Sequence, residues 1–101
     1  MQHVIKSFNR EFLVNVTPGK SVTIEFNGKK NEFVIGDVAE YDSYNLSYHG
    51  EILSITDKTV TFKEKYSTRK RRLKLSEFAW RNYNFNLEES NARNTEISYT
   101  I

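Results

Sequence analysis

The sequence predicts an all-β domain of short antiparallel strands, and three observations point to that class. Apolar and polar residues alternate with a period of two over much of the chain before Ser76, which places them on opposite faces of strands. Turn-forming residues separate these stretches, most clearly Asn27-Gly28. No stretch before Ser76 carries a helical apolar stripe. With 101 residues, the chain is expected to form a single domain with one modest core.

Residues 1–35 are expected to form a β-meander. A strand over 11–16 ends at the turn 17–20, where proline presets the backbone and glycine supplies a positive φ. The next strand, 22–26, alternates cleanly and leads through Asn27-Gly28 into a return strand over 31–35.

A second unit is expected over residues 36–85. It begins with a short strand at 38–41, and a loop then leads into a longer strand over 47–56. A tight turn at Asp57-Lys58 precedes the alternating stretch 59–66. After the polar loop 67–71, alternation returns over 72–75, so three consecutive antiparallel strands are predicted here.

The end of the chain changes character and is predicted to contain helix. Ser76 is expected to cap a short helical turn over 77–80 through its hydroxyl. Asn86 and Glu89 have the spacing of a capping box, which predicts a short C-terminal helix from Leu87. The β-branched residues of 97–101 also fit a last strand, so 86–101 is open to either interpretation.

In the order of its elements, residues 36–85 resemble an SH3-like small barrel of the Tudor, KOW and Sm type. The residues that carry this resemblance are Gly36-Asp37, His49-Gly50-Glu51-Ile52, Val60-Thr61-Phe62 and Arg72-Leu73-Lys74-Leu75. The resemblance implies a small, bent antiparallel barrel closed by a helical turn, with the N-terminal strands as a hairpin extension. No aromatic cage stands at the matching loop positions, which argues against recognition of methylated lysine or arginine.

The segment from Arg72 to Phe85 is also similar to segments of small phage and mobile-element proteins.

Positive charge is concentrated between Lys58 and Lys74, where eight Lys and Arg residues face one acid, Glu64. This segment carries +7 although the whole chain carries only +2, so the remaining residues sum to −5. A field of this kind attracts anionic partners.

If the strands 59–66 and 72–75 pair, burial of their apolar residues directs the alternate cations to one outer face. Folding alone gives no reason to gather like charges in a ladder, because opposed like charges are destabilising. The cations at the predicted hairpin tip extend the patch, and two tyrosines beside the basic segment and the long loop are candidates for base stacking. The predicted nucleic-acid-binding residues are Lys63, Lys65, Arg69, Lys70, Arg71, Arg72, Lys74, Tyr44 and Tyr66.

Other aromatic residues have two interpretations. Tyr41 and Tyr48 flank the loop that borders the ligand groove in small barrels, so they are either groove or core residues. Phe62, Phe78 and Trp80 are expected in the core, with Trp80 closing one end of the barrel.

Catalysis finds little support in the sequence. Neither His3 nor His49 lies in a recognisable arrangement with a nucleophile, and the glycines are isolated, so no phosphate-binding glycine loop occurs. Without cysteine, thiolate metal sites are excluded, and the acids Asp37, Glu40 and Asp42 are expected to be solvated rather than to bind metal. We therefore expect no enzymatic activity, no cofactor and no metal.

The sequence carries neither a signal-peptide pattern nor an apolar run of membrane-spanning length, so a cytoplasmic protein is expected.

The favoured function is a non-enzymatic module that binds the backbone of DNA or RNA with low sequence specificity. Two alternatives remain open. A protein of a phage or another mobile element could inhibit a host protein by presenting the cationic hairpin to an acidic or nucleic-acid-binding surface. Capture of a small nucleotide signal in a pocket would use the same Arg and Tyr residues.

Overall fold

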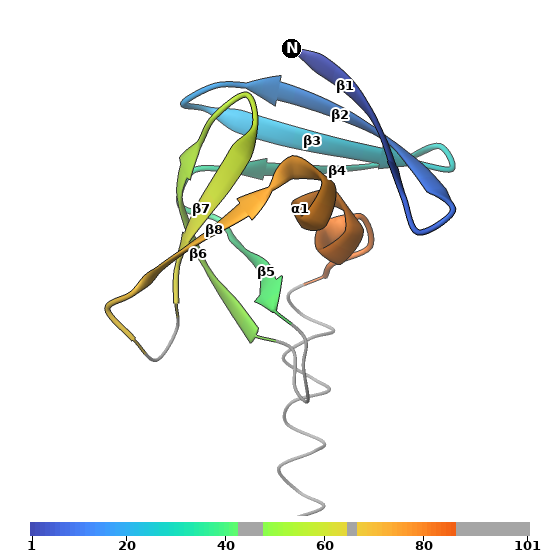
Figure 1. The fold of residues 1–101 in the computed structure, drawn as a ribbon. Coiled ribbons are helices and arrows are strands. Elements are labelled where there is room, and N and C mark those ends of the chain that lie inside the picture. Colours follow the sequence, from blue (N-terminus) through green and yellow to red (C-terminus); the bar gives the residue numbers. More distant parts are fainter. Residues whose placement is uncertain (43–47, 65–66, 87–101) are drawn as a thin grey trace, which may run out of the picture.

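The computed structural model describes residues 1–42, 48–64 and 67–86, which form eight strands and one helix in two antiparallel sheets (Figure 1). The first sheet has the order β1-β2-β3-β4 and the second the order β5-β6-β7-β8. This arrangement confirms the predicted small, barrel-like all-β class. The elements are β1 (Gln2–Ser7), β2 (Arg10–Thr17), β3 (Ser21–Phe26), β4 (Lys29–Val34), β5 (Val38–Asp42), β6 (Tyr48–Ile55), β7 (Thr59–Lys63), β8 (Lys70–Lys74) and α1 (Leu75–Asn82).

The N-terminal sheet is larger than the predicted hairpin extension. The turn at Asn27 and Gly28 has φ values of 50° and 81°, as a two-residue turn that matches the strand twist requires. Strand β1 was not predicted, and it pairs with β2 along its whole length. Its turn consists of Phe8 and Asn9, with φ values of 48° and 65°, so the chain makes this turn without glycine.

The second sheet bends sharply. Its register shifts between Glu40 and Asp42 and again between Ile52 and Ser54, and irregularities of this kind increase the local twist. Gly50 lies so close to β7 that a Cβ atom there would collide with the carbonyl oxygen of Lys63. The glycine therefore permits the close approach of the two backbones.

The two sheets and α1 enclose one core. The ring of Phe78 in α1 lies 5.4 Å from that of Phe33 in the first sheet and 5.9 Å from that of Phe62 in the second. All three side chains are buried. Helix α1 thus packs between the sheets, as Figure 1 shows.

Hydrogen bonds from two asparagines attach α1 to both sheets. The side-chain amide of Asn82 donates to the carbonyl oxygen of Glu40 at 2.9 Å, and its oxygen accepts from the Glu40 amide at 2.8 Å. On the other sheet, the Asn31 side chain donates to the carbonyl oxygens of Asn82 and Phe85. These hydrogen bonds hold the C-terminal end of α1 between β4 and β5.

The predicted capping of the helix by Ser76 is wrong. The helix begins two residues earlier than predicted, at Leu75, and its N-cap is Lys74, which has an extended backbone and makes no side-chain capping hydrogen bond. Leu75 is buried as predicted, although it lies in α1 and not in a strand. The predicted helix from Leu87 lies outside the described residues. Within the described residues, no helix has the length and apolar character needed to cross a membrane.

Candidate nucleic-acid interface

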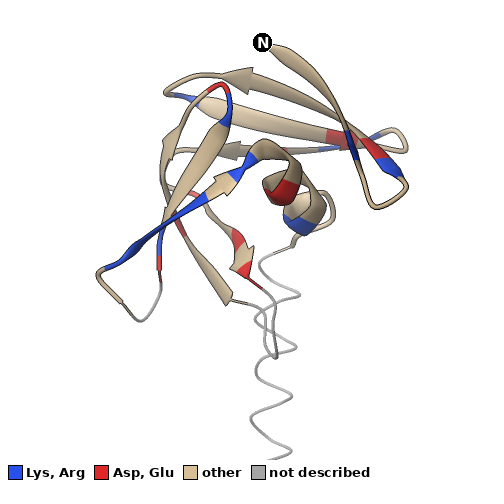
Figure 2. Cartoon of the chain, in the orientation of Figure 1, with Lys and Arg blue, Asp and Glu red and all other residues tan. Residues whose placement is uncertain are grey.

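The β7–β8 hairpin carries cations on its outer face, as predicted. Val60 pairs with Leu73, and both side chains are buried. The parity of the strands then directs Lys63, Lys70, Arg72 and Lys74 outward, and all four are exposed. Figure 2 shows the resulting line of basic residues along β8.

The register sets the order of side chains across this face. Lys63 lies opposite Lys70, and on its other side it lies opposite Glu51 of β6. In the next row, Arg72 lies opposite Thr61, which in turn pairs with Ser54. The outer face therefore combines cations with neutral hydroxyl groups, and both types of side chain contact phosphate in nucleic-acid complexes. Sequence reasoning missed Ser54 and Thr61, which the register alone brings beside the cations.

Lys63 and Lys70 place two positive charges directly opposite each other in the hairpin. Like charges directly opposite one another in an antiparallel pair destabilise the sheet by roughly 0.2–1 kcal/mol. Glu51 offsets part of this repulsion from one side only. The arrangement is therefore unfavourable for folding by itself.

Arg69 lies in the hairpin turn and is exposed. Its amide donates to the Ser67 hydroxyl at 3.0 Å, and its carbonyl oxygen accepts from the Glu64 amide at 3.2 Å. These two bonds fix the backbone that presents the guanidinium.

Arg71 departs from the prediction that placed it in the loop at the hairpin tip. Strand β8 already begins at Lys70, so Arg71 pairs with Phe62 and shares the inward-facing side of that strand. One of its guanidinium nitrogens lies 3.9 Å from a carboxylate oxygen of Asp42. Arg71 is thus partly neutralised, and it contributes less to the outer face than its sequence position indicates.

The acids beside the hairpin are engaged by Arg81 of α1. Its guanidinium lies 3.9 Å from Glu40, 3.8 Å from Asp42 and 3.2 Å from Glu77. Asp37, the third of the acids considered above as metal ligands, instead accepts a hydrogen bond from the Val34 amide. In the described part of the chain, no three His, Asp or Glu side chains are grouped so as to hold a metal ion.

The predicted aromatic contributors are only partly described. Tyr44, Tyr66 and Lys65 lie outside the described residues. Tyr41 is buried, with its ring 6.0 Å from that of Phe62, so its interpretation as a groove residue is wrong. Tyr48 is half-buried and packs against the core.

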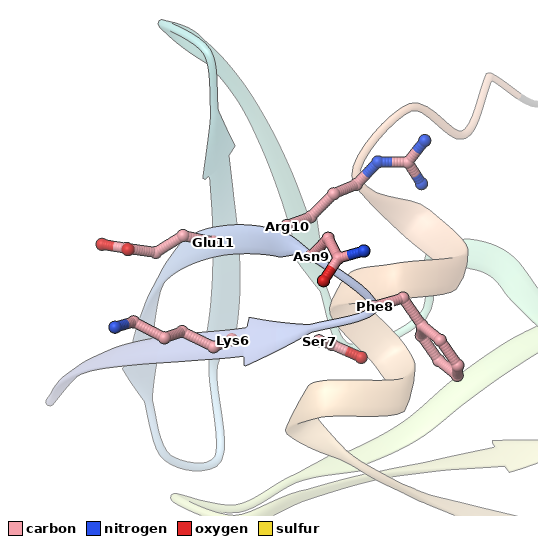
Figure 3. A pocket seen from close by; sticks show the side chains of 6 residues that line it. All are labelled: Lys6, Ser7, Phe8, Asn9, Arg10 and Glu11. Atoms are coloured by element: carbon pink, nitrogen blue, oxygen red, sulfur yellow. The ribbon is translucent and has the colours of Figure 1, made fainter.

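A second cluster, which sequence reasoning missed, lies at the β1–β2 hairpin. The Phe8 ring lies 4.9 Å from that of Trp80, and the Arg10 guanidinium lies 4.5 Å from the Trp80 ring centroid and 5.3 Å from that of Tyr83. In Figure 3, Phe8 and Arg10 extend on the helix side of the hairpin, whereas Lys6 and Glu11 extend away from it. Trp80 therefore ties this hairpin to α1 and does not simply close one end of the barrel.

No protein-family model matches the chain, and the searches of curated proteins and solved structures found no similar protein.

Proposed function

We propose that this protein is a non-enzymatic binding module that holds nucleic acid by its phosphate backbone along the outer face of the β7–β8 hairpin. The observation that carries the proposal is the exposed row of Lys63, Lys70, Arg72 and Lys74 on two paired strands. Strands present these cations at set spacings, so binding does not require the ordering of a flexible basic tail.

The dimensions of the row suit one strand of a DNA duplex. Alternate residues of a strand are ~7 Å apart, so the outer-face cations of β8 span roughly 13 Å, or about four nucleotide rises of one strand. The hydroxyls of Ser54 and Thr61 lie across the same face and can donate to phosphate oxygens. Arg72 offers a planar fork for a bidentate contact, whereas the lysines act as mobile point charges.

Low sequence specificity follows from the same geometry. Phosphate contacts position a protein but carry no base information. The described helix, α1, has eight residues, and Phe78 and Ala79 at its centre are buried in the core. It is therefore not placed to enter a DNA groove as a recognition helix.

A second candidate is an acidic or nucleic-acid-binding protein surface, and the edge position of β8 favours it. An edge strand offers backbone groups to which a partner strand can pair, and the alternating cations would then select acidic side chains in that partner. This function fits a protein that inhibits a host factor.

The test is the salt dependence of binding to fluorescently labelled single-stranded DNA, duplex DNA and RNA. If the four outer-face cations each contact one phosphate, the logarithm of the association constant should fall with a slope of about −3.6 in log salt for duplex DNA. The triple variant Lys63→Ser, Arg72→Ser, Lys74→Ser should lower that slope to about −0.9.

The control removes the same charge from exposed positions outside the hairpin, as Lys20→Ser, Lys29→Ser, Lys30→Ser. It should keep most of the affinity and nearly the whole slope. Equal slopes for the two triple variants would mean that the hairpin is not the binding surface. A parent protein that binds none of the nucleic acids at low salt would remove the proposal and leave the protein-binding candidate.

A further inference from the structure

The two sheets end in four edge strands, β1, β4, β5 and β8, and most of these edges are protected. An unprotected edge exposes backbone groups that can pair with another chain. Asn82 occupies backbone groups of β5 at Glu40. On β8, alternating cations repel a second copy of the same strand. On β4, the exposed charged residues Lys30 and Glu32 stand in the middle part of the strand and also protect the edge.

Strand β1 differs because an apolar side chain stands at its centre. Val4 is 63% exposed, and its neighbours on the same face are Gln2 and Lys6. No charged residue lies at the middle of this edge. The middle of β1 therefore lacks the charged side chain that protects the edges of many natural sheets.

The hydrogen bonds show which groups of β1 point outward. Met1 and Val16 exchange both of their backbone bonds at 2.7 Å, so they form a hydrogen-bonded pair. Such pairs alternate along an antiparallel ladder, so His3, Ile5 and Ser7 also bond to β2. The amide and carbonyl groups of Gln2, Val4 and Lys6 therefore point away from the sheet, and no other described residue bonds to them.

We propose that β1 pairs with β1 of a second copy of this chain, antiparallel, with Val4 opposite Val4. This register uses all three outward-pointing residues, since Gln2 of each copy then lies opposite Lys6 of the other. The contact is symmetric about a two-fold axis and closes on itself, as most homodimer interfaces do. On the outer face the two valines contact each other, and each Gln2 oxygen can accept from a lysine ammonium group.

The same register also accounts for the exposed apolar groups on the other face of β1. Met1 lies opposite Ser7 of the second copy and hence beside Phe8, and these two side chains are 62% and 75% exposed. Phe8 extends on the helix side of its hairpin (Figure 3), and its ring lies 4.9 Å from that of Trp80. One pairing thus covers three of the five large apolar side chains exposed on the described residues, the other two being Val34 and Ile35.

A dimer formed through β1 would carry two basic hairpins, whatever their ligand is. Pairing through β1 leaves the β7–β8 hairpins of both copies outside the contact, because they belong to the other sheet. Two basic surfaces on one particle raise avidity for a long polyanion without any new contact.

The test begins with sedimentation velocity over a concentration series that reaches ~1 mM, where even a weak specific contact associates. The parent should pass from monomer to dimer. Val4→Lys and Val4→Glu should each remain monomeric, because like charges then face each other at the two-fold axis. Mixed in equal amounts, the two variants should form a heterodimer, detected by native mass spectrometry.

Val34→Lys is the control, because Val34 is an exposed valine on the β4 edge and lies outside the contact. It should dimerise as the parent does. Hydrogen exchange of the parent adds a measurement that needs no substitution, since the amide of Val4 should gain protection as concentration rises. A parent that stays monomeric, or folded Lys and Glu variants that do not pair with each other, would overturn the proposal.

Discussion

The side-chain amide of Asn82 acts as a short substitute for a neighbouring strand. It bonds to both the amide and the carbonyl of Glu40 on an edge strand, and it also donates to the carbonyl of Phe78 at 3.1 Å. Because the residue is fully buried, water cannot replace these partners. One side chain therefore joins the helix to the second sheet.

Replacing Asn82 by Leu should lower the free energy of unfolding by about 2–4 kcal/mol, since two half-buried backbone groups of Glu40 would lose their partner and the leucine would keep water from replacing it. Urea unfolding followed by circular dichroism measures the change. Asn84→Leu, at an exposed position just after the helix, is the control and should change stability little. Equal effects of the two substitutions would contradict the role given to Asn82.

Two glycines should respond differently to the same substitution. Gly28 needs its positive φ of 81° but has open space around it, so Gly28→Ala should cost only ~1 kcal/mol. In Gly50→Ala, the new methyl group would collide with the backbone of β7, which cannot move aside, and the cost should be at least ~3 kcal/mol. Thermal unfolding of both variants tests the order, and a Gly50→Ala protein as stable as Gly28→Ala would refute it.

At the residue level, the outward direction of Lys63, Arg72 and Lys74 was predictable because it follows from the buried residues of the same strands. The inward direction of Arg71 was missed because β8 begins earlier than its apolar residues indicate. Counting back two positions from Leu73 would have placed Arg71 on the buried face. The ion pairs of Arg81 depend on tertiary packing, and no local pattern predicts them.

At the level of elements, the strands with clean alternation and a glycine or proline turn were predicted to within a few residues. Strand β1 was missed for a physical reason. Val4 and Ile5 are adjacent apolar residues on opposite faces, which hides the period of two, and the turn at Phe8 and Asn9 contains no glycine. The outward direction of the hairpin cations was predicted better than the N-terminal sheet, because the pattern that sets it is local in the sequence.

The contact between the β1–β2 hairpin and α1 can be measured as a coupling energy. In a double-mutant cycle with Arg10→Ala and Trp80→Leu, the interaction term should be about 0.5–1 kcal/mol, as expected for a cation above a partly exposed aromatic ring. The control cycle uses Lys6→Ala, because Lys6 extends away from the helix in Figure 3. Its coupling with Trp80→Leu should be close to zero, and a similar value in both cycles would argue against the stacking.

At the scale of the whole molecule, charge and packing are divided between different surfaces. The cations of the candidate interface lie on the outer face of the second sheet, whereas the buried side chains of both sheets meet on the inner side. Substitutions at the outer-face cations should therefore change binding with little change in stability. This separation makes the salt-dependence experiment on the hairpin interpretable.

The SH3-like resemblance implies a barrel over residues 36–85 with the N-terminal strands as an extension, but the core does not divide in this way. Six buried apolar residues come from the first sheet, and ten come from the second sheet and α1, in one continuous cluster. The segment that resembles an SH3-like barrel would expose the inner face of its sheet and the apolar face of α1 if the first sheet were removed. The N-terminal strands are thus part of the fold and not an accessory to it.

We therefore predict that residues 36–101 do not fold alone. Expressed without residues 1–35, this fragment should show no cooperative thermal transition, because Phe33 and Phe12 no longer cover Phe78 and Tyr83. In the full chain, Trp80 fluorescence and the circular dichroism of the strands should report one coincident unfolding transition. Mixing the fragment with a peptide of residues 1–35 is the control, since restored structure would show that the missing surface is the cause. A fragment that unfolds cooperatively without the peptide would mean that the second sheet and α1 form an independent barrel.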